Sequence, residues 1–166
     1  MKTLVLWRLI PIVTIALALS SQGVAQSSSP SKIGGLIQHY TAALDANGPW
    51  FISGEWSVWA KGNSGKADFS AVLNMIRSDN ATRQPHTHHV TMVDGEFALT
   101  GTGFAVSGVA DVTSNGNLVF AGVPVEIEVT GGTAVAYSNV LVRFTGGGAL
   151  NHFGAEPLTG VVTPER

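Results

Sequence analysis

The sequence predicts an all-β fold, mainly an antiparallel sandwich or barrel of about seven to nine strands, with one N-terminal helix. Apolar and polar residues alternate along most of the chain after residue 49, and turn residues recur at short intervals between these segments. Glycine is abundant, with 20 in 166 residues, while only 12% of the residues are charged. The chain has no cysteine, so its stability must come from packing rather than from disulfides.

Residues 1–25 have the pattern of an export signal. A basic start with Lys2 and Arg8 precedes an apolar run over residues 9–19, and Gly23-Val24-Ala25 offers small residues for cleavage. The apolar run is shorter than the roughly 20 residues that a membrane helix needs, and no later segment could span a bilayer. We therefore expect a periplasmic or extracellular protein that has no integral membrane segment once the signal is removed.

The expected mature chain would begin at Gln26, with residues 26–32 as a flexible lead-in and residues 33–166 as a single β-rich domain. Loss of Lys2 and Arg8 from the 9 basic residues would leave 7 against 11 acidic ones, a net charge of −4 with neutral histidines. This balance argues against nucleic acid or an anionic membrane surface as a partner. So little charge does not protect exposed strand edges, which leaves self-association open.

Residues 33–46 carry the pattern expected of the N-terminal helix. Apolar residues recur there at three- and four-residue steps, and Asn47-Gly48 supplies a stop signal. The members of this stripe are Ile33, Leu36, Ile37, Tyr40 and Leu44. Such a stripe predicts a helix that packs on a sheet or plugs one end of a barrel.

The alternating segments predict the strands in order. A hairpin is expected over residues 52–75, and a following strand from His86 to Val93 would end at the turn signal Asp94-Gly95. A long, bent strand is expected over residues 97–113, and Asn115-Gly116 is typical of a type I′ turn before the strand over residues 119–129. Residues 135–144 predict a central strand, and residues 158–162 a short last one. The predicted core comprises Trp56, Val58, Phe69, Leu73, Val106, Val125, Ile127, Val140 and Val142.

Three of the five histidines lie at the start of the His86–Val93 strand. Successive side chains of a strand point to opposite faces, so His86 and His88 share one face, roughly 6 to 7 Å apart at Cα, and His89 points the other way. Neutral imidazoles bind zinc, copper, nickel or iron, and three or four converging nitrogens or carboxylates make a site. Two imidazoles on one strand face are therefore a candidate half of a metal site.

His152, in the glycine-bounded segment over residues 149–154, is the preferred third ligand. Asp94 or His89 would complete or support the shell, the latter if a bulge after Pro85 turned it inward. Copper and zinc are the leading metals because imidazole suits both. The opposite interpretation is a polar strand entrance with solvated histidines, with His152 hydrogen-bonded in its own turn.

The segment His86-Thr87-His88 on an expected strand resembles the metal-binding strand of cupins, which are jelly-roll proteins. The likeness covers only these residues. The glutamate expected a few residues further on is missing, Asp94 is the nearest acid, and no second motif surrounds His152. The chain is therefore not assigned to that family.

The sequence predicts no catalytic residue. It has no Gly-X-Ser-X-Gly elbow, no phosphate-binding loop, and no nucleotide or flavin fingerprint that opens a helix. Two other functions remain open beside a metal site. The low charge and glycine-rich strands favour a structural or adhesive β-domain, and the apolar faces favour a small barrel that holds an apolar ligand.

Overall fold

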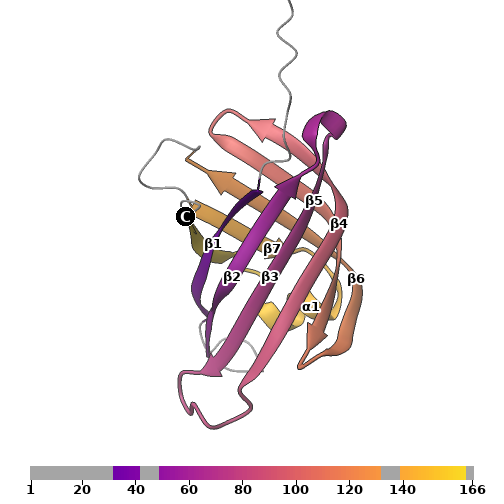
Figure 1. Cartoon of the computed structure of the whole chain (residues 1–166). Coiled ribbons are helices and arrows are strands. Elements are labelled where there is room, and N and C mark those ends of the chain that lie inside the picture. The colour runs from indigo at the N-terminus through magenta and orange to yellow at the C-terminus, as the bar shows by residue number, and fades with distance from the viewer. Residues whose placement is uncertain (1–31, 42–48, 132–138, 164–166) are drawn as a thin grey trace, which may run out of the picture.

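The computed structural model of the protein describes residues 32–41, 49–131 and 139–163. These residues form a closed antiparallel barrel in which each strand pairs with its neighbours in sequence and β1 pairs with β8 (Figure 1). The strands are β1 (Lys32–Thr41), β2 (Trp50–Ala60), β3 (Lys66–Arg77), β4 (His86–Thr100), β5 (Gly103–Ser114), β6 (Asn117–Thr130), β7 (Asn139–Phe144) and β8 (Leu158–Thr163). The all-β antiparallel prediction is confirmed, and the closed barrel decides against a sandwich.

Alternation along the strands directs every second side chain into the barrel interior. All nine predicted core residues are buried, from Trp56 in β2 to Val142 in β7. Large side chains meet there, among them Phe69, Leu73 and Phe144, each at most 2% exposed. The interior of the described barrel is therefore a packed apolar core.

The predicted helix over residues 33–46 is wrong, because β1 occupies residues 32–41. Only Ile37 of the described apolar stripe is fully buried, whereas Leu36 and Tyr40 are about half exposed. The rest of the predicted helix and its stop signal lie outside the described residues. A three- and four-residue spacing also occurs by chance in a strand, and pairing with β2 along all of β1 overrides the local pattern.

Two consecutive glycines explain why β1 suits the barrel better than a helix. Gly34 and Gly35 each cost a helix about 1 kcal/mol relative to alanine. In β1, a Cβ on Gly35 would overlap the Val161 carbonyl oxygen of β8, and a Cβ on Gly34 would lie 2.7 Å from the Trp56 carbonyl oxygen. The missing side chains therefore allow the close backbone approach that joins β1 to its neighbours.

The described residues contain one α-helix, α1 (Gly147–Phe153), near the C-terminal end rather than the N-terminal end. Ala149 and Phe153 are its buried residues, and the Phe153 ring stacks on Phe144 of β7 at a centroid distance of 4.3 Å. Figure 1 shows α1 near the end of the barrel where the connection from β3 to β4 lies. Within the described residues, no helix is long and apolar enough to span a bilayer.

The turn predicted at Asp94-Gly95 is instead a bulge inside a longer strand. β4 continues to Thr100, and the chain reverses at residues 101–102, where a long, bent strand was expected. The register with β5 shifts between Met92 and Glu96, and Asp94 has a φ of 57°. Asp-Gly is a turn signal because both residues tolerate positive φ, but here pairing with both neighbours keeps the strand continuous.

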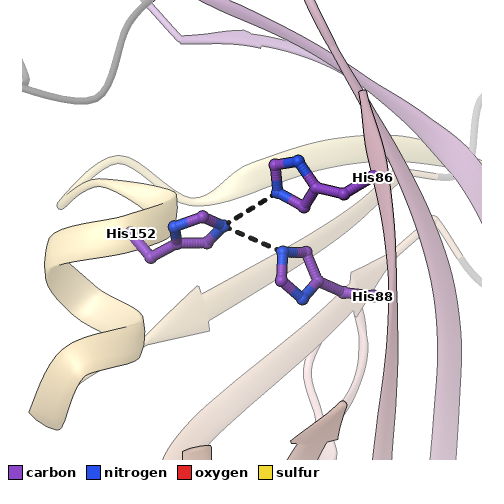
Figure 2. A group of neighbouring side chains, drawn as sticks. All are labelled: His86, His88 and His152. Atoms are coloured by element: carbon purple, nitrogen blue, oxygen red, sulfur yellow. Dashed lines mark hydrogen bonds between the residues drawn. The ribbon is translucent and has the colours of Figure 1, made fainter. Parts of the chain in front are cut away.

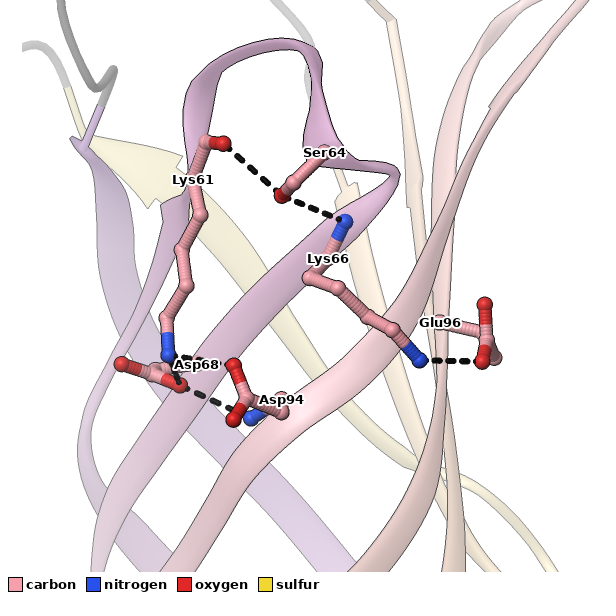
Figure 3. A network of polar contacts seen from close by, with 6 residues as sticks. All are labelled: Lys61, Ser64, Lys66, Asp68, Asp94 and Glu96. Carbon is pink, nitrogen blue, oxygen red and sulfur yellow. Dashed lines mark hydrogen bonds and ion pairs between the residues drawn. The ribbon is translucent and has the colours of Figure 1, made fainter.

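A polar network on the outer surface holds this bulge (Figure 3). Lys61, next to the short 3-10 turn η1 (Gly62–Ser64), contacts the carboxylates of Asp68 and Asp94 at 2.7 Å each. The Asp94 backbone N–H also donates to Asp68 Oδ1 at 2.9 Å. Lys66 and Glu96 form a second ion pair beside it. The bulged backbone is thus tied to the hairpin between β2 and β3.

Replacing Gly35 distinguishes a strand from a helix by the sign of its effect. Gly35→Ala should lower the free energy of unfolding by about 1 to 3 kcal/mol, because its Cβ overlaps the Val161 carbonyl. Helical residues 33–46 would instead be stabilised by about 1 kcal/mol. Urea unfolding measures the change. Gly101→Ala is the control, since a Cβ there meets nothing within 4 Å. Equal effects of both changes would contradict the close approach of β1 to β8 at Gly35.

Candidate metal centre

The first residues of β4 place two histidines toward the interior. His88 is 2% exposed and pairs with Leu73 of β3 and Ser114 of β5, so it lies within the sheet on both sides. His86, two residues earlier on the same face, is half-buried, while His89 is exposed on the outer face. The alternation is regular here, so this part of the described strand lacks the bulge after Pro85 that would be needed to turn His89 inward.

Helix α1 brings the third histidine to the same place. Phe153 anchors the helix in the core, and His152, the residue before it, is half-buried. Gly147 has a φ of 67°, which glycine adopts without strain as the chain enters the helix. Gly148 packs so closely on Phe120 of β6 that a Cβ would lie 2.7 Å from the ring. The glycines thus let a short helix lie close to the barrel with His152 directed at β4.

The three imidazoles converge through their Nε2 atoms (Figure 2). His152 Nε2 lies 2.8 Å from His88 Nε2 and 3.3 Å from His86 Nε2. One ligand atom from each of the three residues can be chosen so that all lie within 4.8 Å of one another. In a tetrahedral zinc site with Zn–N bonds of about 2.0 to 2.1 Å, ligand nitrogens are about 3.3 Å apart. Two of the three separations in the described cluster, 2.8 and 3.3 Å, are close to this value, and the third is at most 4.8 Å, so the histidines could hold one ion after small side-chain movements.

Backbone carbonyls fix which nitrogen of each strand histidine faces the centre. The Nδ1 of His86 lies 2.8 Å from the Gln84 carbonyl oxygen, and the Nδ1 of His88 lies 2.9 Å from the Thr113 carbonyl oxygen. A carbonyl only accepts, so Nδ1–H must donate and each neutral ring keeps a lone pair on Nε2. Metal-bound histidines are oriented in this way by a second partner.

One proton cannot satisfy this arrangement fully. If His152 Nε2 carries a hydrogen, it can donate well to His88 Nε2 or to His86 Nε2, but a bond shared between both is weaker for each. The lone pair on the other histidine then lacks a full partner in a half-buried place, which costs free energy. A divalent ion between the three nitrogens would accept all three lone pairs at once, provided that His152 is deprotonated at Nε2.

Burial lowers the pKa values of His88 and His152. Desolvation by burial is the main cause that lowers the pKa of His88 from 6.5 to about 4. The hydrogen bond to the Thr113 carbonyl raises this pKa, whereas the neighbouring His152 and His86 lower it further. The pKa of His152 is also lowered, first by burial and then by His86. Neutral rings at pH 7 are the form that binds a metal.

Two of the predicted site residues lie elsewhere. His89 points outward from β4, and Asp94 is eight residues from His86 along the same strand, roughly 25 Å at the usual rise. Asp94 is also exposed and engaged by Lys61. The structure brings together His86, His88 and His152 and leaves these two apart.

Several residues at the site were not predicted. Gln84 has a φ of 54°, uncommon for a residue with a side chain, and this backbone places its carbonyl at His86. Trp50 and Phe120 lie beside the cluster, with ring centroids 5.1 Å from His86 and 5.9 Å from His152. The sequence signals only that Gln84 precedes a proline and that Trp50 is one of several aromatic residues in its strand.

Acid should destabilise the metal-free protein through His88. Between pH 6.5 and about 4 the unfolded chain binds a proton that the folded His88 does not, so the free energy of unfolding falls as pH falls, by up to about 1.4 kcal/mol per pH unit. Above pH 6.5 His88 is neutral in both the folded and the unfolded chain, so it no longer makes the free energy of unfolding depend on pH. Urea unfolding with chelator present, from pH 7.5 to 4.5, measures this slope.

His88→Gln should make that slope shallower, and His89→Gln, on the exposed face of the same strand, should leave it unchanged. Equal slopes in wild type and His88→Gln would show that His88 is not held neutral by the fold.

No protein-family model matches the chain, and neither a curated protein nor a solved structure matches it significantly. The family of the chain is therefore not assigned, and its function is inferred from the histidine cluster itself.

Proposed function

We propose that this β-barrel binds one divalent transition metal ion through the Nε2 atoms of His86, His88 and His152. The observation that carries the proposal is the convergence of three nitrogens of which two are already oriented by backbone carbonyls. Each strand histidine keeps its lone pair toward the same point, and His152 approaches that point from a different element.

Copper and zinc are the metals that suit the proposed site best. Imidazole binds both, and the site offers neither cysteine sulfur nor, among the described residues of the cluster, a carboxylate that would favour magnesium or calcium. Copper is favoured over zinc where geometry does not decide, because divalent copper binds nitrogen ligands more tightly. Three protein ligands would leave a fourth position for an external ligand, as in catalytic rather than structural zinc sites.

The packing of the barrel favours this proposal over an apolar-ligand carrier. Phe69, Leu73, Met75, Met92 and Phe144 are almost fully buried and occupy the described interior. A carrier of an apolar ligand needs an unfilled, largely apolar cavity. No feature of the described residues points specifically to a structural or adhesive role, whereas the histidine cluster brings together side chains from two separate elements.

We also propose that the protein acts outside the cytoplasm. The support is the basic start, apolar run and small residues within positions 1–25, and the absence of cysteine fits a chain that does not depend on redox conditions. A site of three neutral imidazoles needs no thiolate, so it would keep its ligands in an oxidising compartment.

Metal binding can be tested by calorimetric titration of the untagged protein with Cu²⁺ and Zn²⁺. We expect one ion per chain, and His88→Ala or His152→Ala should weaken binding by more than about 100-fold, beyond the loss caused by removing a supporting partner. His89→Ala is the matched control, because it removes an imidazole from the same strand but from the outer face. Unchanged affinity in His88→Ala or His152→Ala removes that residue from the site.

Export can be tested by mass spectrometry on protein recovered outside the cytoplasm of its own host. We expect an N-terminus at Gln26, because cleavage after Gly23-Val24-Ala25 releases the apolar run. Recovery of the chain with Met1 intact would contradict cleavage at that position.

A further inference from the structure

A pocket of about 420 Å³ opens directly onto the histidine cluster. The three histidines form one wall, and the residues used below, Trp50, Gln84, Ser114, Asn115 and Phe120, form others. Apart from the histidines, the described residues that line it contain no acidic or basic side chain. A metal ion held by the cluster would therefore be reachable from this pocket.

Charge decides what kind of fourth ligand such a metal would take. Three neutral imidazoles leave a divalent ion with its full charge of about +2, and no carboxylate among the described lining residues offsets it. In a half-buried site this charge attracts an anion more strongly than a neutral molecule, because screening by water is reduced. A carboxylate oxygen suits both copper and zinc.

The aromatic side chains around the pocket favour an anion that carries a planar apolar group. Trp50 is 4% exposed and meets His86 edge to face, with Arg77 over its ring at 5.5 Å. Phe120 of β6 packs closely against Gly148 of α1 and lies beside His152. The rings thus stand on two sides of the cluster in fixed positions. A planar apolar group attached to the anion would gain contact with Phe120 at little cost in ordering the protein.

We propose that the metal-loaded site binds a small aromatic monocarboxylate, with one carboxylate oxygen on the metal and the ring against Phe120. This inference rests on the metal site proposed above. The uncharged polar groups of Gln84, Ser114 and Asn115 supply hydrogen bonds to the second carboxylate oxygen. Asn115 is already fixed, since its Oδ1 accepts from the Thr87 N–H at 3.2 Å and its own N–H donates to the Thr87 carbonyl at 2.9 Å.

The test uses protein loaded with Co²⁺, whose visible spectrum reports the number and type of metal ligands. Titration with acetate and benzoate should change the spectrum saturably, with benzoate bound about 3- to 10-fold more tightly, the factor expected from one aromatic contact. Benzyl alcohol has the ring without the charge and should leave the spectrum unchanged. Phe120→Ala should remove most of the preference for benzoate while acetate binding stays the same, and Phe51→Ala, an exposed ring on the outer face of β2, should change neither.

The outcomes separate the two proposals. If Co²⁺ does not bind, or binds equally well to His152→Ala, the metal site itself is overturned. If Co²⁺ binds once per chain through the histidines but neither acetate nor benzoate changes its spectrum, the metal site stands and the anion site is overturned. Equal affinities for acetate and benzoate, or an unchanged preference in Phe120→Ala that still binds one Co²⁺, would overturn the assignment of the aromatic group.

Discussion

The pairing of β1 with β8 closes the barrel and sets where the other elements lie. Both strands must approach their neighbours closely, and glycines make this approach possible: a Cβ on Gly160 would overlap the Leu36 carbonyl, just as one on Gly35 would overlap that of Val161. The Trp56 indole lies under Gly35 and donates to the Val161 carbonyl at 3.2 Å. Closure gives every described strand a partner on both sides, which removes the long free edge that a chain with so few charged residues would otherwise have to protect.

The same closure creates the histidine cluster. Because β7 and β8 complete the barrel, the segment between them must return across one end, and α1 forms there with Phe153 stacked on Phe144. A helix of seven residues is not stable alone, so its packing against the barrel supports it. His152 lies next to this anchor residue, and its position relative to β4 is therefore set by the core rather than by a surface loop.

The histidine cluster combines the burial of titratable side chains with a fixed orientation of their nitrogen lone pairs. Desolvation by burial, and to a smaller extent the neighbouring imidazoles, lower the pKa values of His88 and His152. Backbone carbonyls then direct the strand histidines so that their remaining lone pairs meet at one point. Gln84 contributes one of these carbonyls from a backbone conformation that most residues avoid. Strain and burial at the same place are typical of a functional site, and here both favour a metal ion.

The alternation of the strands, the predicted core and the shared face of His86 and His88 could be predicted from the sequence, because these follow from the two-residue period of a strand. The sequence also located the type I′ turn, where Asn115 and Gly116 both have positive φ values. The strand over residues 32–41 depends on tertiary contacts, since pairing on both sides outweighs a local helical spacing. The position of the third histidine depends on tertiary contacts in the same way. His152 meets His88 across 64 residues of sequence, and no local pattern specifies a contact that depends on how the barrel closes.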